Sequence, residues 1–199
     1  ARQLIKDCHL ALETYRFDLC ASAIYEFVWH EYCDWYLELS KSIFWDDNIG
    51  VEQQAATRRT LLQVLESLLR ISHPIMPFIT ETLWHQVAPR LGVEGTSIMT
   101  QSFPEAASCK ADEEAEQQIE WLKAVITALR NIRGEASIKP NQGIDVVLQD
   151  GDQSDRIQAS NAEEMLKRLA NVTSIEWLES GVEPPPNALA LVGLSLIHI

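Results

Sequence analysis

The segment that most constrains the fold is a stretch of about one helix length, residues 19–43, that is apolar around most of its girth. A helix of this kind loses free energy wherever its apolar sides meet water, so we expect it to occupy the centre of a helix bundle. The side chains concerned are Leu19, Ala23, Ile24, Phe27, Val28, Trp29, Tyr32, Trp35, Tyr36 and Leu39.

Three further amphipathic patterns predict helices over residues 2–14, 51–72 and 77–91. Asp18 is a candidate N-cap for the long apolar helix, and the residue before Pro74 avoids helical backbone, which ends the 51–72 helix. The expected core faces consist of Leu61, Leu62, Val64, Leu65, Leu68, Leu69 and Ile71 in one helix and of Ile79, Leu83, Val87 and Leu91 in the next.

The second half of the chain changes its period. A long helix is predicted over residues 114–133, followed by strands over 144–148 and 172–178, with a short helix over 160–170 between them. Residues 188–192 are a candidate third strand. This order of elements is typical of a small α/β unit.

The fold class is therefore predicted as mainly α, an antiparallel helix bundle followed by a small α/β domain. We place the bundle at residues 1–102, a connector at 103–113, and the long helix with the α/β domain at 114–194. Residues 195–199 are interpreted as a tail that is not native to the fold. The chain begins inside a helical pattern, and we expect that helix to be part of a longer one.

Composition restricts the classes of function. The formal net charge is −13 and both halves are acidic, which disfavours non-specific nucleic-acid binding, so any RNA contact must be a local patch. No apolar run approaches the roughly 20 residues that a membrane span needs, and no membrane role is expected. The four cysteines form no CxxC pair, and we interpret them as reduced thiols in a cytoplasmic protein.

Three segments carry a family resemblance. They read YEFVWHEYCDWYLELSK at residues 25–41, RISHPIMPFITETLWHQV at 70–87 and LRNIRGE at 129–135. In this order and at these separations they closely resemble the region that follows the catalytic part of bacterial-type valyl-tRNA synthetases. The resemblance extends from residue 1 to about residue 194, and the CDWYLE string is the part that looks specific to the valine enzymes.

The resemblance implies the anticodon-binding helical domain of a class I aminoacyl-tRNA synthetase and the small domain after it. The parent enzyme joins valine to its tRNA at the expense of ATP. This chain has neither the family's ATP-binding motifs nor a GxxxxGK loop, so we expect it to be inactive alone and to hold no cofactor or metal. Its expected partners are tRNA(Val), through the anticodon, and the catalytic and coiled-coil parts of the same enzyme, in a cytoplasmic monomer.

The long helix has one polar side. At about 100° per residue, Ser22, Glu26, His30, Asp34 and Glu38 advance by about 40° each and form one arc. Leu37 falls near the middle of this arc. A lone exposed leucine is common, but a leucine here can also pack under an unstacked RNA base, and the resemblance places the corresponding leucine against the anticodon.

The candidate tRNA-binding residues are therefore His30, Asp34 and Leu37, with three nearby cations. Lys41 either neutralises a phosphate or pairs with Glu38 three residues before it. Arg58 and Arg59 either extend the same patch or belong to a solvated helix face.

The remaining candidates have ordinary structural interpretations. We expect Trp35 and Tyr36 in the core, whereas Trp29 lies at the edge of the polar arc. Arg130 and Arg133 either complement a helix dipole or face RNA. Two pairs could begin a metal or protease site, His30 with Cys33 and Glu81 with His85. Neither has the further ligands that a zinc site needs, and we expect Glu81 and His85 to form a surface pair or a cap.

Two other classes of function stay open at this point. A helical protein-interaction module without an RNA role agrees with the acidic charge. A thiol or metal enzyme is the third interpretation. The three family segments favour the RNA-binding part of a ligase over both.

Overall fold

The computed structural model describes residues 1–46, 49–179, 181–183, 190–192 and 196–198. The chain forms two compact units, Ala1–Ala111 and Asp112–Ile199. Each unit has its own core and is described separately below.

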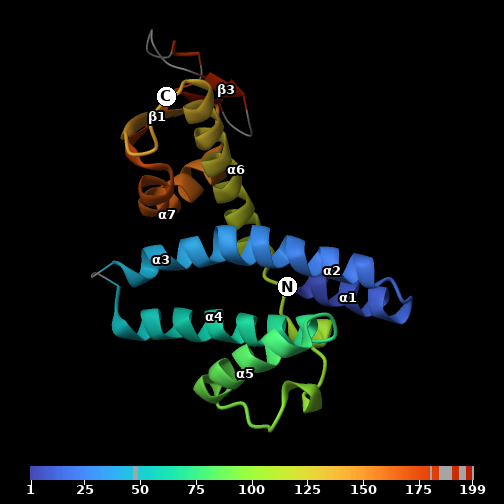
Figure 1. Cartoon of the computed structure of the whole chain (residues 1–199). Coiled ribbons are helices and arrows are strands. Elements are labelled where there is room, and N and C mark those ends of the chain that lie inside the picture. The colour runs from blue at the N-terminus through green and yellow to red at the C-terminus, as the bar shows by residue number, and fades with distance from the viewer. Residues whose placement is uncertain (47–48, 180, 184–189, 193–195, 199) are drawn as a thin grey trace. The chain divides into compact units, whose positions relative to one another are not determined.

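The first unit is helical. Its two principal layers are a long helical rod and a second helix, α4, that runs back alongside it (Figure 1). The elements are α1 (Arg2–Glu13), α2 (Phe17–Glu26), η1 (Phe27–Leu37), α3 (Glu38–Phe44), α4 (Val51–Ser72) and α5 (Pro77–Leu91), followed by two short 3₁₀ turns, η2 (Ile98–Thr100) and η3 (Ala106–Ser108).

Local backbone chemistry sets the helix ends. Tyr15 adopts a positive φ of 56°, which turns the chain between α1 and α2. Pro77 occupies the first turn of α5, where a missing N–H costs nothing, and Gly92 ends that helix in the left-handed conformation with φ 71°. The helices predicted over residues 51–72 and 77–91 are confirmed with these bounds.

The rod α2–η1–α3 differs from the prediction of one regular α-helix over residues 19–43. Its central stretch, η1, is a π-helix of 11 residues with i→i+5 hydrogen bonds. Asp18 is not the N-cap. That position belongs to Arg16, whose guanidinium donates to the Asp18 carboxylate at 2.8 and 2.6 Å.

The rod is also less central than its sequence predicts. No residue of η1 is fully buried, and α2 buries only Cys20 and Ile24. Leu19 and Trp29 are about half exposed, at 50% and 54%. The expectation of a helix that is central in the bundle therefore holds only in part for the described residues, because α1 and α4 cover only part of its girth.

Two apolar clusters hold the first unit together. One joins α1, α2 and α4, and the other joins α4 and α5 with the η2 turn. The buried members are Leu4, Ile5, Cys8, Ala11, Cys20, Ile24, Leu68 and Ile71 in the first and Leu69, Trp84, Val87, Ala88 and Ile98 in the second.

The buried face of α5 differs from the predicted one. Ile79 and Leu83 are 52% and 38% exposed, and α5 instead packs through Thr80, Trp84 and Val87 with Ala88. The reason is a polar anchor: the Trp84 indole donates to the buried Glu66 carboxylate of α4 at 2.9 Å. This bond fixes the rotation of α5 about its axis.

The second unit is a small α/β domain. It contains α6 (Glu113–Glu135), β1 (Ile144–Gln149), α7 (Gln153–Ala170), β2 (Val172–Leu178), β3 (Ala190–Val192) and β4 (Leu196–His198). The sheet order is β2-β1-β4-β3. β1 and β2 are parallel and joined through α7, whereas β4 is antiparallel to both β1 and β3.

The predicted strands over 144–148 and 172–178 are confirmed, the first with one more residue. The helix predicted over 160–170 begins earlier, at Gln153, because Asp152 and Asp155 form a reciprocal capping box. Of the candidate strand 188–192, residues 188 and 189 lie outside the described residues. In the 195–199 tail, residues 196–198 form β4, while 195 and 199 are likewise not described.

The predicted fold class is thus confirmed: the structure is mainly α, with a helical unit followed by a small α/β domain.

Candidate nucleic-acid interface

The polar side of the rod is open to solvent in the first unit. Its N-terminal members Ser22, Glu26, His30 and Asp34 are exposed, whereas Glu38 and Lys41 are partly buried. We call the row Ser22, Glu26, His30, Asp34, Glu38 and Lys41 the polar stripe. The arc predicted from the sequence is therefore present as a surface.

The π-helix straightens this stripe. Each π-turn takes in more residues than an α-turn, so side chains four apart drift less around the axis. His30 shows the result, because its two ring nitrogens lie 3.7 Å from the Glu26 carboxylate and 3.4 Å from that of Asp34. The imidazole is thus placed between two acidic neighbours, with about half of its side chain exposed.

Leu37 is the last residue of η1 and is partly exposed. Along the rod it follows Asp34 by three residues and His30 by seven, and it precedes Lys41 by four. The structure thus leaves it accessible without making it a protruding side chain.

The three candidate cations lie on two helices. Lys41 of α3 forms an ion pair with Glu38 at 2.5 Å, so the local pairing considered in the sequence is present. Arg58 of α4 is exposed, and its guanidinium lies 5.0 Å from the centre of the Phe44 ring in α3. Phe44 follows Lys41 by three residues and shares its side of the helix, so Arg58 reaches the same end of the rod. Arg59, next in the chain, is exposed.

The aromatic side chains are less buried than the sequence suggests. Trp35 and Tyr36 are only partly buried, so their assignment to the core holds only in part. Burial raises the pKa of Tyr32 to about 12, and its hydroxyl donates to the Leu61 carbonyl of α4 at 3.2 Å. Tyr32 thus ties the rod to α4, and the Tyr36 ring lies beside it with centroids 6.1 Å apart.

An exposed aromatic pair goes beyond what the sequence analysis predicts. The Tyr25 and Trp29 rings are parallel within 3°, with centroids 6.4 Å apart, and both side chains are more than half exposed. Their spacing of four residues is the only sequence signal for the pair.

Arg133 has a structural role. It is 7% exposed and donates to the carbonyls of Lys139, Gln142 and Asn171 at 3.0, 2.6 and 2.9 Å. It therefore closes the turn before β1 and is not available to RNA. Arg130, three residues earlier, is exposed near the end of α6.

Glu81 and His85 form the expected surface pair at 2.9 Å. The other Glu81 oxygen accepts from the Ser97 hydroxyl and the Ile98 amide at 3.0 and 3.2 Å, which caps the η2 turn. Among the described residues there is no cluster of three or more His, Cys, Asp or Glu side chains arranged to hold a metal ion.

Within the part of the chain that the structure describes, no helix has the length and apolar character needed to cross a membrane.

Comparison with known proteins identifies the family. Residues 1–148 match the family described as the anticodon-binding domain of tRNA ligase. The chain is also 42% identical over 191 residues to a valine–tRNA ligase of Acinetobacter baylyi; the match covers 96% of this chain but 20% of that relative's length. With a family match over most of its length, on a helix bundle whose polar stripe is open, the chain belongs to the anticodon-binding domains of tRNA ligases.

Proposed function

We propose that this chain recognises the anticodon region of valine tRNA as part of a longer valine–tRNA ligase. That enzyme would attach valine to tRNA(Val) using ATP bound elsewhere in its polypeptide, in the cytoplasm and as a monomer. The 42% identity to a valine–tRNA ligase supports the valine assignment. The observation that carries the RNA contact is Leu37, a partly exposed apolar side chain on the rod between Asp34 and Glu38 of the open polar stripe in sequence.

The stripe offers what a single-stranded base requires. Unstacked bases are recognised by an apolar or aromatic surface against one face and by polar groups along the edge. In this proposal Leu37 supports the face of a base. His30 and Asp34 stand on the same row and offer a ring nitrogen and carboxylate oxygens to its edge.

Phosphate contacts come from the cations at the end of the rod. Arg58 and Arg59 are exposed and free of carboxylate partners among the described ion pairs, so they offer charge directly. Lys41 must exchange its Glu38 partner for a phosphate, and the exchange costs little because the present ion pair is at most partly buried and stays in reach of solvent. These contacts position the tRNA, whereas the base contacts specify it.

The test is binding of an anticodon stem–loop RNA of valine tRNA at low salt, followed by fluorescence anisotropy. We expect Leu37→Ala to weaken binding about tenfold, since a base–side-chain contact contributes roughly 1–3 kcal/mol, with little change in melting temperature. Leu10→Ala, a substitution at a 62%-exposed leucine of α1, is the matched control and should leave binding unchanged.

An RNA with an altered anticodon should bind the unmodified chain as weakly as the Leu37→Ala variant binds the native one. Equal affinity for both RNAs would contradict anticodon recognition. If neither RNA binds at low salt, the alternative of a helical protein-interaction module without an RNA role replaces the proposal for the isolated chain.

A further inference from the structure

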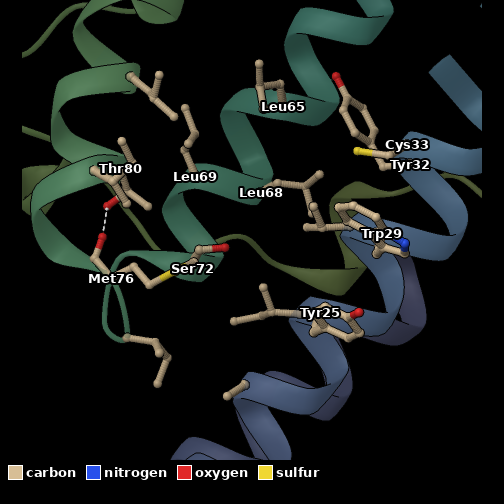
Figure 2. A pocket seen from close by; sticks show the side chains of 16 residues that line it. Tyr25, Trp29, Tyr32, Cys33, Leu65, Leu68, Leu69, Ser72, Met76 and Thr80 are labelled. Atoms are coloured by element: carbon tan, nitrogen blue, oxygen red, sulfur yellow. Dashed lines mark hydrogen bonds between the residues drawn. The ribbon is translucent and has the colours of Figure 1, made fainter.

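An apolar groove of about 490 Å³ lies between the rod and the helices α4 and α5. It adjoins the polar stripe at Tyr25, whose ring meets the His30 ring edge to face with centroids 6.1 Å apart. It is bounded by α2 and η1 on one side and by α4 and α5 on the other (Figure 2). Tyr25 and Trp29 stand on one wall, with Leu68 and Leu69 of α4 between the walls. Its lining contains no charged side chain, and the Thr80 hydroxyl is satisfied by the Met76 carbonyl at 2.7 Å.

This groove leaves apolar surface in water. Tyr25, Trp29, Ile79 and Leu83 are 57%, 54%, 52% and 38% exposed, although all four line it. A contiguous apolar surface of this kind marks an interaction site more often than a free surface. The sequence points the same way, because residues 19–43 are apolar around most of the helix's girth, which is typical of a helix that is central in a bundle.

The walls have the spacing of a helix receptor. Each of the three helices contributes side chains separated by three or four residues: Tyr25, Trp29 and Tyr32 from the rod, and Ile79 with Leu83 from α5, with a matching row on α4. Rows of this spacing form the ridges and grooves into which another helix packs. An amphipathic helix placed in a groove uses the same i, i+3, i+4 pattern.

The chemistry disfavours a polyanion as the occupant. RNA backbones are held by cations, and this lining contains no charged side chain in a chain of net charge −13. The occupant must therefore present an apolar face. The chain corresponds to 20% of its relative's length, so most of such a polypeptide lies outside these 199 residues and is available to supply one.

We propose that this groove receives an amphipathic helix from the part of the longer ligase polypeptide that lies outside residues 1–199. The inference rests on the proposed function in so far as it requires that longer polypeptide. The helix completes the bundle around η1 and covers Tyr25 and Trp29, next to the polar stripe that the Tyr25–His30 contact adjoins.

Hydrogen–deuterium exchange on the full-length ligase and on the 199-residue chain tests this directly. Amides of residues 24–33 and 76–83 should exchange at least about tenfold more slowly in the full-length protein, because packing suppresses local opening. Ile79→Glu in the full-length protein should remove this protection at residues 24–33. Phe78→Glu is the matched control: Phe78 neighbours Ile79 in sequence and is 89% exposed, but it does not line the groove.

Three results would overturn the proposal. The first is equal exchange at residues 24–33 in the two proteins. The second is a dimer of the 199-residue chain that Ile79→Glu dissociates in sedimentation, which would make a second copy the occupant. The third is protection of the groove by tRNA alone in the 199-residue chain. Since the main measurement needs no RNA, its failure is distinguishable from failure of the anticodon assay.

Discussion

The hydrogen bond between Trp84 and Glu66 sets how α5 is rotated on α4, and Trp84→Phe tests its weight. Trp84 is 1% exposed and Glu66 is 4% exposed, so neither group has water as a substitute partner. The Glu66 carboxylate also accepts from Arg70 at 2.8 and 3.1 Å, and Arg70 donates further to the Ser102 carbonyl at 2.9 Å. One indole N–H thus belongs to a network that ties α4 to α5 and to the segment after η2.

The magnitude follows from two losses. A buried hydrogen bond to a charged group contributes about 1.5–3 kcal/mol, and the smaller phenyl ring leaves a cavity that costs about 1 kcal/mol more. We therefore expect Trp84→Phe to destabilise the first unit by about 3 kcal/mol. For a unit of roughly 100 residues this lowers the melting temperature by about 12 °C or more.

The assay is thermal and urea unfolding followed by circular dichroism, in the native and Glu66→Gln backgrounds. Because a neutral amide oxygen accepts a weaker bond, Trp84→Phe should cost about 1–2 kcal/mol less in the Glu66→Gln background. Trp121→Phe is the control: the Trp121 indole donates to Asp155 within the second unit at 2.8 Å, so only the transition of that unit should move. An equal cost of Trp84→Phe in both backgrounds would refute the claim that the carboxylate bond carries the effect.

Two further predictions concern other buried groups. Burial, with Cys20 beside it, raises the pKa of the Cys8 thiol from 9.0 to about 12. Since the folded pKa is the higher one, the stability that the protonated thiol contributes is complete below about pH 9 and is lost as the pH rises from 9 toward 12. Urea midpoints of the native chain should therefore fall across that window, and those of Cys8→Ala should fall less. Arg133→Lys should destabilise the second unit by about 2–3 kcal/mol, because one ammonium cannot reach the three carbonyls that the guanidinium fork joins; an unchanged unfolding midpoint of that unit would show that the fork is dispensable.

Sequence patterns predict the regular elements well where the period is strong and the ends carry proline or glycine. The bounds of α4 and α5 match their predicted ranges, and Pro77 and Gly92 restrict the backbone at the ends of α5. At the end of α4 the predicted reason is wrong, because His73 keeps helical dihedrals of φ −57° and ψ −40° before Pro74. Pro74 ends the helix because it has no N–H to donate. The start of α7 is not predicted from the sequence. Its signal is a pair of aspartates, Asp152 and Asp155, and their capping role depends on a geometry that an acidic, loop-like sequence does not reveal.

The site is predictable in its polar half only. The four-residue spacing from Ser22 to Glu38 specifies the stripe, since any helical backbone brings those positions to one side. The π-helix of η1 and the rotation of α5 are tertiary outcomes. The rotation of α5 depends on a bond between Trp84 and Glu66, eighteen residues apart, and the sequence pattern of residues 27–37 gives no sign of the π-helix. The spacing of apolar residues in the sequence predicts neither the π-helix nor the rotation of α5. The exposure of Ile79 and Leu83 follows from the rotation of α5.

The acidic charge and the RNA-binding assignment are compatible because they concern different ranges of interaction. Long-range attraction falls with a net charge of −13, which lowers the rate and strength of non-specific association. In the proposed recognition, the stripe needs only short-range contacts, an apolar support at Leu37 and a few cations near Phe44. Under that proposal an acidic bundle suppresses binding to wrong RNA and keeps the contacts that identify the right one, and the attraction is supplied by other parts of the proposed longer ligase. Binding of the isolated chain should accordingly weaken less steeply with salt than that of the full-length protein.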